Sequence, residues 1–223
     1  MTITPNSGTG PGSITPDGSP VEFYTLLKPE GEAELIAQVV PIGGTVLEIG
    51  AGVGRVTHRL VELGFEVVAV DESAEMLAHI QGARTVHARA QDLRLDRRFD
   101  AVTLASQLVN TDAAGDLLAA AARHLKPGGA LLIQWMPAER HDAWRPGQGR
   151  TKDGLTIELA DVREVSPGLF HATMRYRHGE DEWTQSFSSR RLTDEQLEAE
   201  LAEAGLRLVR FLNEERTWVL AVL

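Results

Sequence analysis

Residues 46–55 constrain the fold more than any other stretch of the chain. They read Val-Leu-Glu-Ile-Gly-Ala-Gly-Val-Gly-Arg, an apolar run followed by three glycines at alternate positions. The apolar run predicts a buried parallel strand. The glycines permit a tight turn and a close approach of the backbone to a ligand. A helix is expected from about Arg55, with its free N–H groups at the same place. This unit predicts an α/β fold with a nucleotide site at the turn.

The glycine spacing and the residue before it indicate which nucleotide is held. A dinucleotide fingerprint requires G-x-G-x-x-G. Here the third glycine comes one residue early, and Arg55 stands where the last glycine is required. Glu48, two residues before the first glycine, would repel a pyrophosphate but attract a ligand that carries an ammonium and a sulfonium group. These residues favour S-adenosylmethionine over NAD.

Several landmarks, taken in chain order, resemble those of class I S-adenosylmethionine-dependent methyltransferases of the small-molecule type. The resemblance covers positions 44 to 136. It implies a Rossmann-like, seven-stranded, mostly parallel sheet with an antiparallel last strand. It also implies methyl transfer from S-adenosylmethionine. In such folds a carboxylate about twenty residues after the glycines accepts the ribose hydroxyls, and Asp71 stands there. After the glycine turn, the landmarks are the strand 66–71, the helix start 73–77, the strand 99–105 and the turn and strand 125–133.

The resemblance also implies where the cofactor is bound. Met76 either flanks the adenine or fills the core, and Tyr24 either closes over the ligand as a lid or packs its helix on the sheet. Arg89 stands where many members of the family have an acid, which moves the expected adenine contacts to the residues after it. Among these, Asp92 alternatively caps a turn. The expected cofactor-binding residues are Tyr24, Glu48, Gly50, Ala51, Gly52, Arg55, Asp71, Glu72, Met76, Ala90, Gln91, Asp92 and Ser106.

Three residues are candidates for positioning or deprotonating the acceptor. Gln107 and Asn110 follow the fourth predicted strand, at the edge where open α/β sheets hold ligands. His141, in a polar and aromatic loop expected over 138–144, is the candidate base because an imidazole titrates near neutral pH. Two of these residues have structural alternatives: Asn110 caps the next helix, and His141 is a surface residue. No acid follows the fourth strand closely, so the expected reaction is independent of metal.

The flanking segments are predicted to be separate elements. Residues 1–20 are rich in Thr, Gly, Ser and Pro, which predicts disorder when no ligand is bound. The methyltransferase domain is expected over 21–223. It begins with two short helices over the nucleotide end of the sheet, broken at residues 28–31. Residues 155–190 alternate like three antiparallel strands. They resemble the insertion that roofs the acceptor pocket in small-molecule N-methyltransferases, although such aromatic stripes also fill a sheet's own core.

Composition limits the kinds of partner that the chain can be expected to bind. The formal net charge is −10, without a Lys/Arg-rich run, which argues against a nucleic-acid partner. No apolar stretch approaches the roughly 18 residues of a membrane span, so no membrane partner and a cytoplasmic location are expected. The chain has no cysteine, which excludes a cysteine nucleophile and thiolate metal sites. The remaining reaction is a polar substitution on a small-molecule amine, phenol or activated carbon. The sequence does not indicate the oligomeric state.

Three other functions share parts of this pattern. A non-catalytic regulatory protein would bind S-adenosylmethionine without turning it over. An NAD(P)-linked oxidoreductase is disfavoured by Glu48 and Arg55. A polyamine synthase has the same sheet but is expected to carry an acidic pair near the fourth strand, where Ser106 and Gln107 stand instead.

Overall fold

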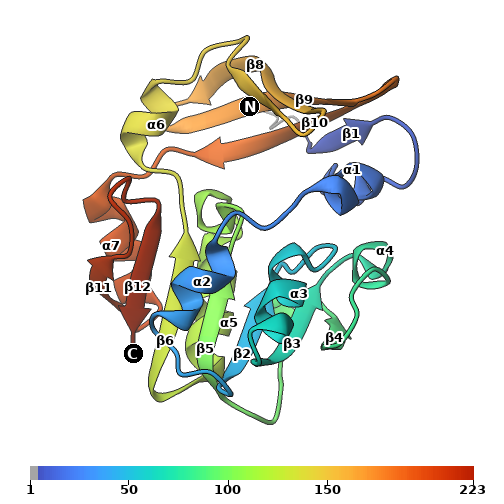
Figure 1. Ribbon diagram of the computed structural model, residues 1–223. Helices are drawn as coiled ribbons and strands as arrows, with labels where there is room; N and C mark the ends of the chain where they lie inside the picture. The colour runs from blue at the N-terminus through green and yellow to red at the C-terminus, as the bar shows by residue number, and fades with distance from the viewer. Residues whose placement is uncertain (1–4) are drawn as a thin grey trace. The chain divides into compact units, whose positions relative to one another are not determined.

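The chain forms two compact units in the computed structural model, which describes residues 5–223 (Figure 1). The larger unit comprises residues 28–137 and 192–223. The smaller unit comprises the N-terminal segment up to residue 27 together with residues 138–191. The chain therefore crosses between the units after Leu27, after Pro137 and after Arg191. The sequence predicts one domain with an insertion at 155–190, whereas the smaller unit also includes residues 138–154 and the N-terminal segment up to residue 27.

The larger unit is built on a seven-stranded sheet. Its strands are β2 (Thr45–Ile49), β3 (Glu66–Asp71), β4 (Arg84–His87), β5 (Phe99–Leu104), β6 (Leu125–Gln134), β11 (Arg207–Phe211) and β12 (Trp218–Val222). The order across the sheet is β11-β12-β6-β5-β2-β3-β4. Strands β4, β3, β2, β5 and β6 run parallel, whereas β12 is antiparallel to β6. This confirms the predicted mostly parallel sheet with an antiparallel last strand.

Helices cover both faces of this sheet. They are α2 (Glu32–Ala37), α3 (Arg55–Glu62), α4 (Ala74–Leu77), α5 (Ala114–His124) and α7 (Asp194–Glu203), with short 3-10 turns η1 (Ala90–Asp92) and η2 (Leu108–Asn110). Val46 of β2 lies in a core cluster with residues of α2 and α3. Its neighbour Leu47 lies in the other cluster with residues of α5 and α7. Successive strand residues point to opposite faces, which explains why the strand is apolar throughout.

The smaller unit is a five-stranded antiparallel sheet with two short helices. Its strands are β1 (Ser7–Thr9), β7 (Gly149–Lys152), β8 (Leu155–Ser166), β9 (Leu169–His178) and β10 (Asp181–Arg190), and its helices are α1 (Val21–Leu26) and α6 (Ala138–Asp142). The order is β1-β10-β9-β8-β7. The three strands predicted within 155–190 are confirmed as β8, β9 and β10. Strands β1 and β7 were not predicted.

The two faces of the antiparallel sheet differ in polarity. Tyr176 is paired with Trp183, and the Phe23 ring of α1 stacks on Tyr176 with centroids 4.2 Å apart. On the opposite face, Thr173 and Ser186 share a hydrogen bond of 2.8 Å. The aromatic stripe read from the sequence therefore does form part of this unit's own core. One apolar and one polar face are typical of antiparallel sheets.

The N-terminal segment is ordered over the described residues 5–20, so the prediction of disorder is wrong there; residues 1–4 lie outside the described part. Strand β1 pairs with β10, and Trp183 Nε1 donates to the Pro11 carbonyl at 2.8 Å. A Cβ built on Gly8 would lie 2.1 Å from the Gly18 oxygen. The glycines that suggested disorder permit this close backbone packing, and the segment is held through its backbone.

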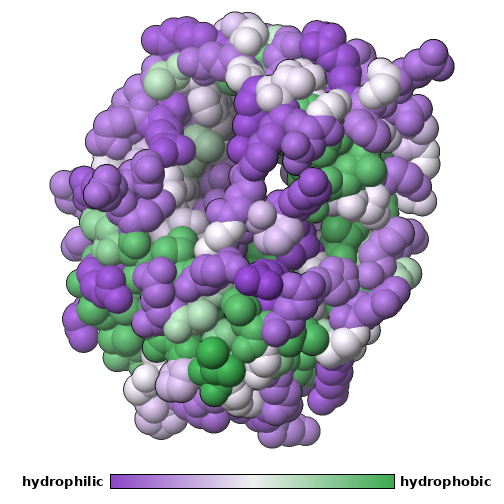
Figure 2. All heavy atoms as spheres, in the orientation of Figure 1, coloured by the Kyte–Doolittle hydropathy of each residue, from purple (hydrophilic) through white to green (hydrophobic). Residues whose placement is uncertain are grey.

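The two helices predicted over residues 21–40 are confirmed as α1 and α2, with residues 28–31 between them. Only α2 belongs to the larger unit, where it lies on a sheet face beside α3 (Figure 1). Figure 2 shows apolar atoms mainly over the visible part of the larger unit. The large hydrophobic side chains that are exposed among the described residues also belong to it: Ile42, Val209 and Leu223. None of the helices over residues 5–223 combines the length and apolarity needed to span a bilayer.

Candidate cofactor and acceptor site

The three glycines after β2 differ in what surrounds them. Gly50, Gly52 and Gly54 all have positive φ, which disfavours any side chain. A Cβ on Gly50 would lie 2.4 Å from Leu108 Cδ1, and one on Gly54 would lie 2.7 Å from Ile80 Cγ1. A Cβ on Gly52 would meet no atom within 4 Å. The outer glycines are therefore required for packing, whereas bare backbone borders open space at Gly52.

Asp71 closes the turn from the neighbouring strand. It ends β3, which lies beside β2. Its Oδ2 accepts from the Gly52 N–H at 2.7 Å, and its Oδ1 accepts from the Ser73 N–H at 2.9 Å. A carboxylate offers about four lone-pair directions, so ribose hydroxyls can be accepted at the same side chain. The turn and Asp71 thus fit a nucleoside.

Glu48 lies beneath the turn and is buried. It accepts a hydrogen bond from the Thr57 hydroxyl of α3. Burial raises the pKa of Glu48 to about 7, although the Thr57 bond and the charge of Arg55 act in the opposite direction. A cation brought near this carboxyl favours its ionised form. Glu48 therefore offers a cationic ligand a charge that depends on pH.

Other predicted cofactor residues are engaged elsewhere in the larger unit. Arg55 forms an ion pair with the buried Glu32 of α2, and its Nη1 lies 3.4 Å from the Lys28 carbonyl oxygen. Glu72 is exposed and forms an ion pair of 3.4 Å with Arg89. The residue that replaces the family's usual acid at position 89 is thus paired with an acid from the neighbouring loop.

The remaining predicted cofactor residues follow the carboxyl ends of β2, β3 and β4. Met76 of α4 is buried. The N–H of Ala51 donates to the Val70 carbonyl at 2.9 Å, which ties the turn to β3. Ala90, Gln91 and Asp92 form η1, in which the last two are exposed.

The chain after β5 is held in a sparsely populated backbone conformation. Ser106 and Gln107 both have a φ of 56°, a region that is uncommon for residues other than glycine. The Ser106 N–H donates to Gln134 Oε1 at 2.7 Å. Consecutive residues of this kind are costly and cluster at functional sites. This favours the edge at Ser106 and Gln107 as part of a site.

Asn110 binds the backbone of Met136 at both its N–H and its carbonyl. Its side chain is 1% exposed. Its Nδ2 donates to the Met136 carbonyl at 3.0 Å, and its Oδ1 accepts from the Met136 N–H at 2.7 Å. Helix α5 begins at Ala114 with Ala113 as its N-cap residue. The alternative in which Asn110 caps this helix is therefore wrong.

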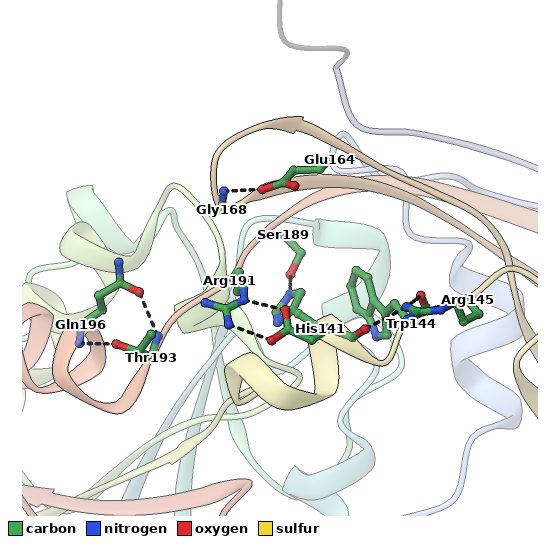
Figure 3. Close-up of polar contacts among 10 residues, drawn as sticks. His141, Trp144, Arg145, Glu164, Gly168, Ser189, Arg191, Thr193 and Gln196 are labelled. Carbon is green, nitrogen blue, oxygen red and sulfur yellow. Dashed lines mark hydrogen bonds and ion pairs between the residues drawn. The ribbon is translucent and has the colours of Figure 1, made fainter.

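His141 is a buried helical residue of the smaller unit. It lies in α6 with 1% of its surface exposed, so the predicted loop and the surface alternative are both wrong. Its Nε2 lies 2.8 Å from Ser189 Oγ, and its ring centroid lies 4.6 Å from that of Trp144. Figure 3 shows Ser189 and Trp144 on different sides of the imidazole, while the neighbouring Arg191 pairs with Asp142. The imidazole is thus held in one orientation.

Tyr24 also belongs to the smaller unit. Its hydroxyl donates to Gln185 Oε1 at 3.1 Å, as does the hydroxyl of Tyr176 at 2.9 Å. Gln185 Nε2 in turn donates to Ser19 Oγ at 2.9 Å. Burial raises the pKa of Tyr24, so its hydroxyl keeps its proton. Tyr24 packs in this network, and its proposed contact with the cofactor stays a prediction.

The structure brings some predicted residues together and adds others. The larger unit gathers the glycine turn, Asp71 and the Ser106 turn at the carboxyl ends of β2, β3 and β5. Tyr24 and His141 belong to the smaller unit. Three residues of the site were not predicted from the sequence: Thr57, Gln134 and Ser189, which hydrogen-bond to Glu48, Ser106 and His141. Only Thr57 had a sequence signal, because the first turn of a helix after a glycine turn lies over the preceding strand.

Comparison with known proteins identifies the family. A methyltransferase-domain family model matches residues 46–129. An uncharacterized methyltransferase of Mycobacterium tuberculosis is 33% identical over 185 residues, which span 79% of this chain and 73% of that relative. The chain belongs to the class I S-adenosylmethionine-dependent methyltransferases. Membership confirms S-adenosylmethionine as the cofactor expected from the sequence, in preference to a nicotinamide coenzyme.

Other matches of this methyltransferase carry more specific names. The dTDP-3-amino-3,4,6-trideoxy-alpha-D-glucopyranose N,N-dimethyltransferase of Streptomyces venezuelae is 29% identical over 136 residues, 56% of this chain and 57% of that protein. The cypemycin N-terminal methyltransferase of a Streptomyces species is 35% identical over 140 residues, 55% of this chain and 57% of that protein. A crystal structure of an S-adenosylmethionine-dependent methyltransferase from Clostridium acetobutylicum has a TM-score of 0.67 at 18% identity. It covers 91% of this chain and 90% of its own, so the likeness of fold extends over both units.

Proposed function

We propose that this methyltransferase transfers the methyl group of S-adenosylmethionine to an amine nitrogen of a small molecule, without a metal. The observation that carries the proposal is the open space at Gly52, next to a carboxylate that already binds the Gly52 N–H. A nucleoside placed there meets bare backbone and the acceptor oxygens of Asp71. The left-handed turn at Ser106 and Gln107, in which Ser106 is exposed, supports an acceptor at the same edge.

In this proposal, five residues of the chain act on the cofactor or the acceptor. The bound cofactor supplies an electrophilic methyl group. Gly52 and Asp71 bind its nucleoside, and Glu48 complements its positive charge. Gln107 orients the acceptor through hydrogen bonds. His141, whose ring Ser189 orients, takes the proton that an ammonium must lose before its nitrogen can attack. Alignment of this kind can supply about 7–11 kcal/mol of the barrier.

An amine is favoured over a phenol or an activated carbon because of the relatives. The sugar N,N-dimethyltransferase and the cypemycin N-terminal methyltransferase are both named for methylation of nitrogen. They differ from one another in the molecule that carries this nitrogen. The amine is therefore the part of the acceptor that the two names share.

The experiment is a turnover assay with a panel of acceptors. Purified protein is incubated with S-adenosylmethionine and nucleotide-linked amino sugars, peptides with free N-termini, simple phenols or carbon nucleophiles. We expect release of S-adenosylhomocysteine and a mass gain of one methyl group with amines alone. Methylation of phenols in preference to amines would contradict the choice of nitrogen. Cofactor binding without product from any acceptor would instead favour the non-catalytic regulatory protein.

The roles of Gln107 and His141 are tested by replacing each with alanine. We expect acceptor-dependent kcat/KM to fall by about 10²-fold or more for His141→Ala, the usual scale of general base catalysis, with the affinity for S-adenosylmethionine unchanged. The matched control is His178→Ala, because His178 is an exposed histidine at the end of β9 in the same unit. An effect of His141→Ala no larger than that of the control would remove His141 from the site.

A further inference from the structure

The chain crosses between the two units at three points. Next to each crossing, the backbone is held by a side chain of the larger unit or by a backbone bridge within it. The crossings follow Leu27, Pro137 and Arg191. The residues on the larger unit's side of these crossings are Lys28, Pro137 and Leu192. What holds them determines how firmly the ends of the smaller unit are attached.

The first crossing is held by Arg55, the first residue of α3 after the glycine turn. Its guanidinium pairs with Glu32, and its Nη1 lies 3.4 Å from the Lys28 carbonyl. The Glu32 carboxylate also accepts from the Glu30 N–H. Arg55 and Glu32 are both largely shielded from water, with 19% and 6% of their side chains exposed. The segment that leads to the smaller unit is therefore fastened to the residue that follows the cofactor turn.

The second crossing is held by Asn110, at the end of η2. Its amide hydrogen-bonds to both the N–H and the carbonyl of Met136, one residue before Pro137. Both groups are backbone groups that would otherwise need partners at the end of β6. This pairing leaves the Asn110 amide directed at the backbone of the crossing segment, at the same edge of the sheet as Ser106 and Gln107.

The third crossing is tied to the second. Pro137 and Leu192 form a parallel backbone bridge, so the outgoing and returning chains leave the larger unit side by side. Asn110 therefore holds both of them, directly through Met136 and indirectly through the bridge. Two residues that sequence alone assigned to ligand binding both contact chain next to a crossing.

We propose that Arg55 and Asn110 are positioning residues, which fix the points where the chain passes between the units and so hold the smaller unit in place for methyl transfer. The proposal rests on the proposed function for its catalytic consequence. Its structural part does not depend on turnover. Because a displacement of about 1 Å in a site can cost about 10²-fold in rate, small movements at these points have catalytic consequences.

The test measures the distance between the units in the full chain. The protein has no cysteine, so Glu180→Cys in the β9–β10 turn and Asp116→Cys in α5, both at exposed positions, provide two spin-label sites. We expect the distance distribution to become about twofold broader in Arg55→Ala and in Asn110→Ala, since motion between domains is the default where the attachment is weak. Glu32→Gln and Asn110→Asp are milder versions that test the same contacts if the alanine variants fold poorly.

Each variant has a matched control. Arg59→Ala removes a second arginine of α3 that also pairs with an α2 glutamate, Glu34 at 2.7 Å. Asn213→Ala removes an asparagine whose side chain also binds backbone: its Oδ1 accepts from the Thr217 N–H at 2.9 Å. Within residues 5–223, Arg59 pairs with Glu34 and Glu62, and the Asn213 side chain binds Thr217 and Trp218. Neither control is therefore expected to broaden the distribution.

The outcomes separate the proposal from the proposed function. We expect the kcat/KM for the acceptor to fall about tenfold or more in Asn110→Ala and Arg55→Ala, with the Kd for S-adenosylmethionine within about twofold of the wild-type value. Distributions in both variants that match the wild type would overturn the proposal, whatever the activity. Loss of cofactor affinity in Arg55→Ala with an unchanged distribution would also overturn it, and would return Arg55 to the cofactor site. If the distance distribution broadens in the variants but the protein has no turnover, the result would support Arg55 and Asn110 as positioning residues but not the proposed function.

Discussion

At the scale of single residues, Gly52 offers the most direct test of the cofactor site. A Cβ at this position enters space that no protein atom occupies within 4 Å. We expect Gly52→Ala to weaken S-adenosylmethionine binding by about tenfold or more, because about 1.4 kcal/mol corresponds to tenfold in affinity and the methyl group takes up ligand space. Isothermal calorimetry measures this directly.

The control for Gly52→Ala is Gly43→Ala. Gly43 also has positive φ and open surroundings, but it lies before β2, away from the turn. Both variants carry the strain of a left-handed alanine, on the order of 1–2 kcal/mol. Equal loss of stability with loss of affinity only in Gly52→Ala is the expected pattern. Undiminished affinity in Gly52→Ala would mean that the ligand does not approach this backbone.

Glu48 makes stability depend on pH in a predictable direction. Its pKa is raised by burial from 4.5 to about 7. Between these values the folded protein holds a proton that the unfolded chain has lost, so the free energy of unfolding falls as pH rises through this range. This contribution to the free energy of unfolding is fully present below about pH 4.5 and lost as pH rises through about 7, and amounts in total to about 3 kcal/mol.

Urea unfolding at pH 5 and at pH 8 checks the effect of Glu48. Glu48→Gln keeps the shape of the side chain but cannot ionise, so this variant is expected to lose much less stability between the two pH values than the wild type. Glu62→Gln is the control, since Glu62 is an exposed glutamate at the end of α3, the helix that carries Thr57. A wild-type protein whose dependence on pH equals that of Glu48→Gln would contradict the raised pKa.

At the scale of elements, Gln185 of β10 holds the N-terminal segment to the antiparallel sheet. It accepts from the hydroxyls of Tyr24 and Tyr176 and donates to Ser19. Gln185→Leu leaves these donors without an acceptor in a buried setting, at about 1–3 kcal/mol for each buried group. We expect faster hydrogen exchange over residues 13–27 and an overall loss on the order of 2–4 kcal/mol.

The comparison for Gln185→Leu is Ser186→Ala, the adjacent residue on the opposite face of β10. Ser186 shares a hydrogen bond with Thr173 on the polar face, where water can replace the lost partner. Its loss is expected to stay below about 1 kcal/mol. Exchange over residues 13–27 that is as slow in Gln185→Leu as in Ser186→Ala would show that backbone pairing alone holds the segment.

At the scale of the whole molecule, the two units are expected to respond unequally to the cofactor. The proposed contacts of Gly52, Asp71 and Glu48 all lie in the larger unit. A ligand present at 100 times its Kd stabilises the structure that binds it by about 2.7 kcal/mol. Native-state hydrogen exchange with and without S-adenosylmethionine is expected to show this gain in β2, β3 and β5, with a smaller gain in β8 and β9. An equal gain in both units would mean that they open together.

The sequence predicted the larger unit well because its signals are local. Val46 and Leu47 belong to a short, fully apolar strand, and the glycines after it define a turn that few other folds use. The capping box that starts α7 is likewise local, because Thr193 and Gln196 lie three residues apart. The three central strands of the smaller unit were equally readable, since Phe170 to Tyr176 alternate with period two.

The roles of particular site residues were less readable. Gln107 and Ser106 were placed at the right edge by strand order, but their left-handed backbone has no sequence signal. His141 was placed in a loop because its segment is polar, whereas its burial comes from Ser189 and Trp144. Asn110 was assigned by its position alone, and only its bonds to Met136 reveal what the side chain contacts.

The sequence by itself determined the glycine turn, the buried strand before it and the cofactor, because each follows from residue types and spacings within a few tens of residues. The mostly parallel sheet with its reversed last strand followed from the family resemblance that these residues carry. Tertiary structure alone decided that residues 5–20 are ordered, that residues 138–154 belong to the smaller unit, and that Arg55 and Asn110 contact chain next to the crossings between the units. These features depend on pairings such as Ser7 with Ser186 and Asn110 with Met136. In these pairings, groups far apart in the chain satisfy one another: backbone with backbone at Ser7, and a side-chain amide with backbone at Asn110. Residue types and spacings along the chain do not specify such distant partners.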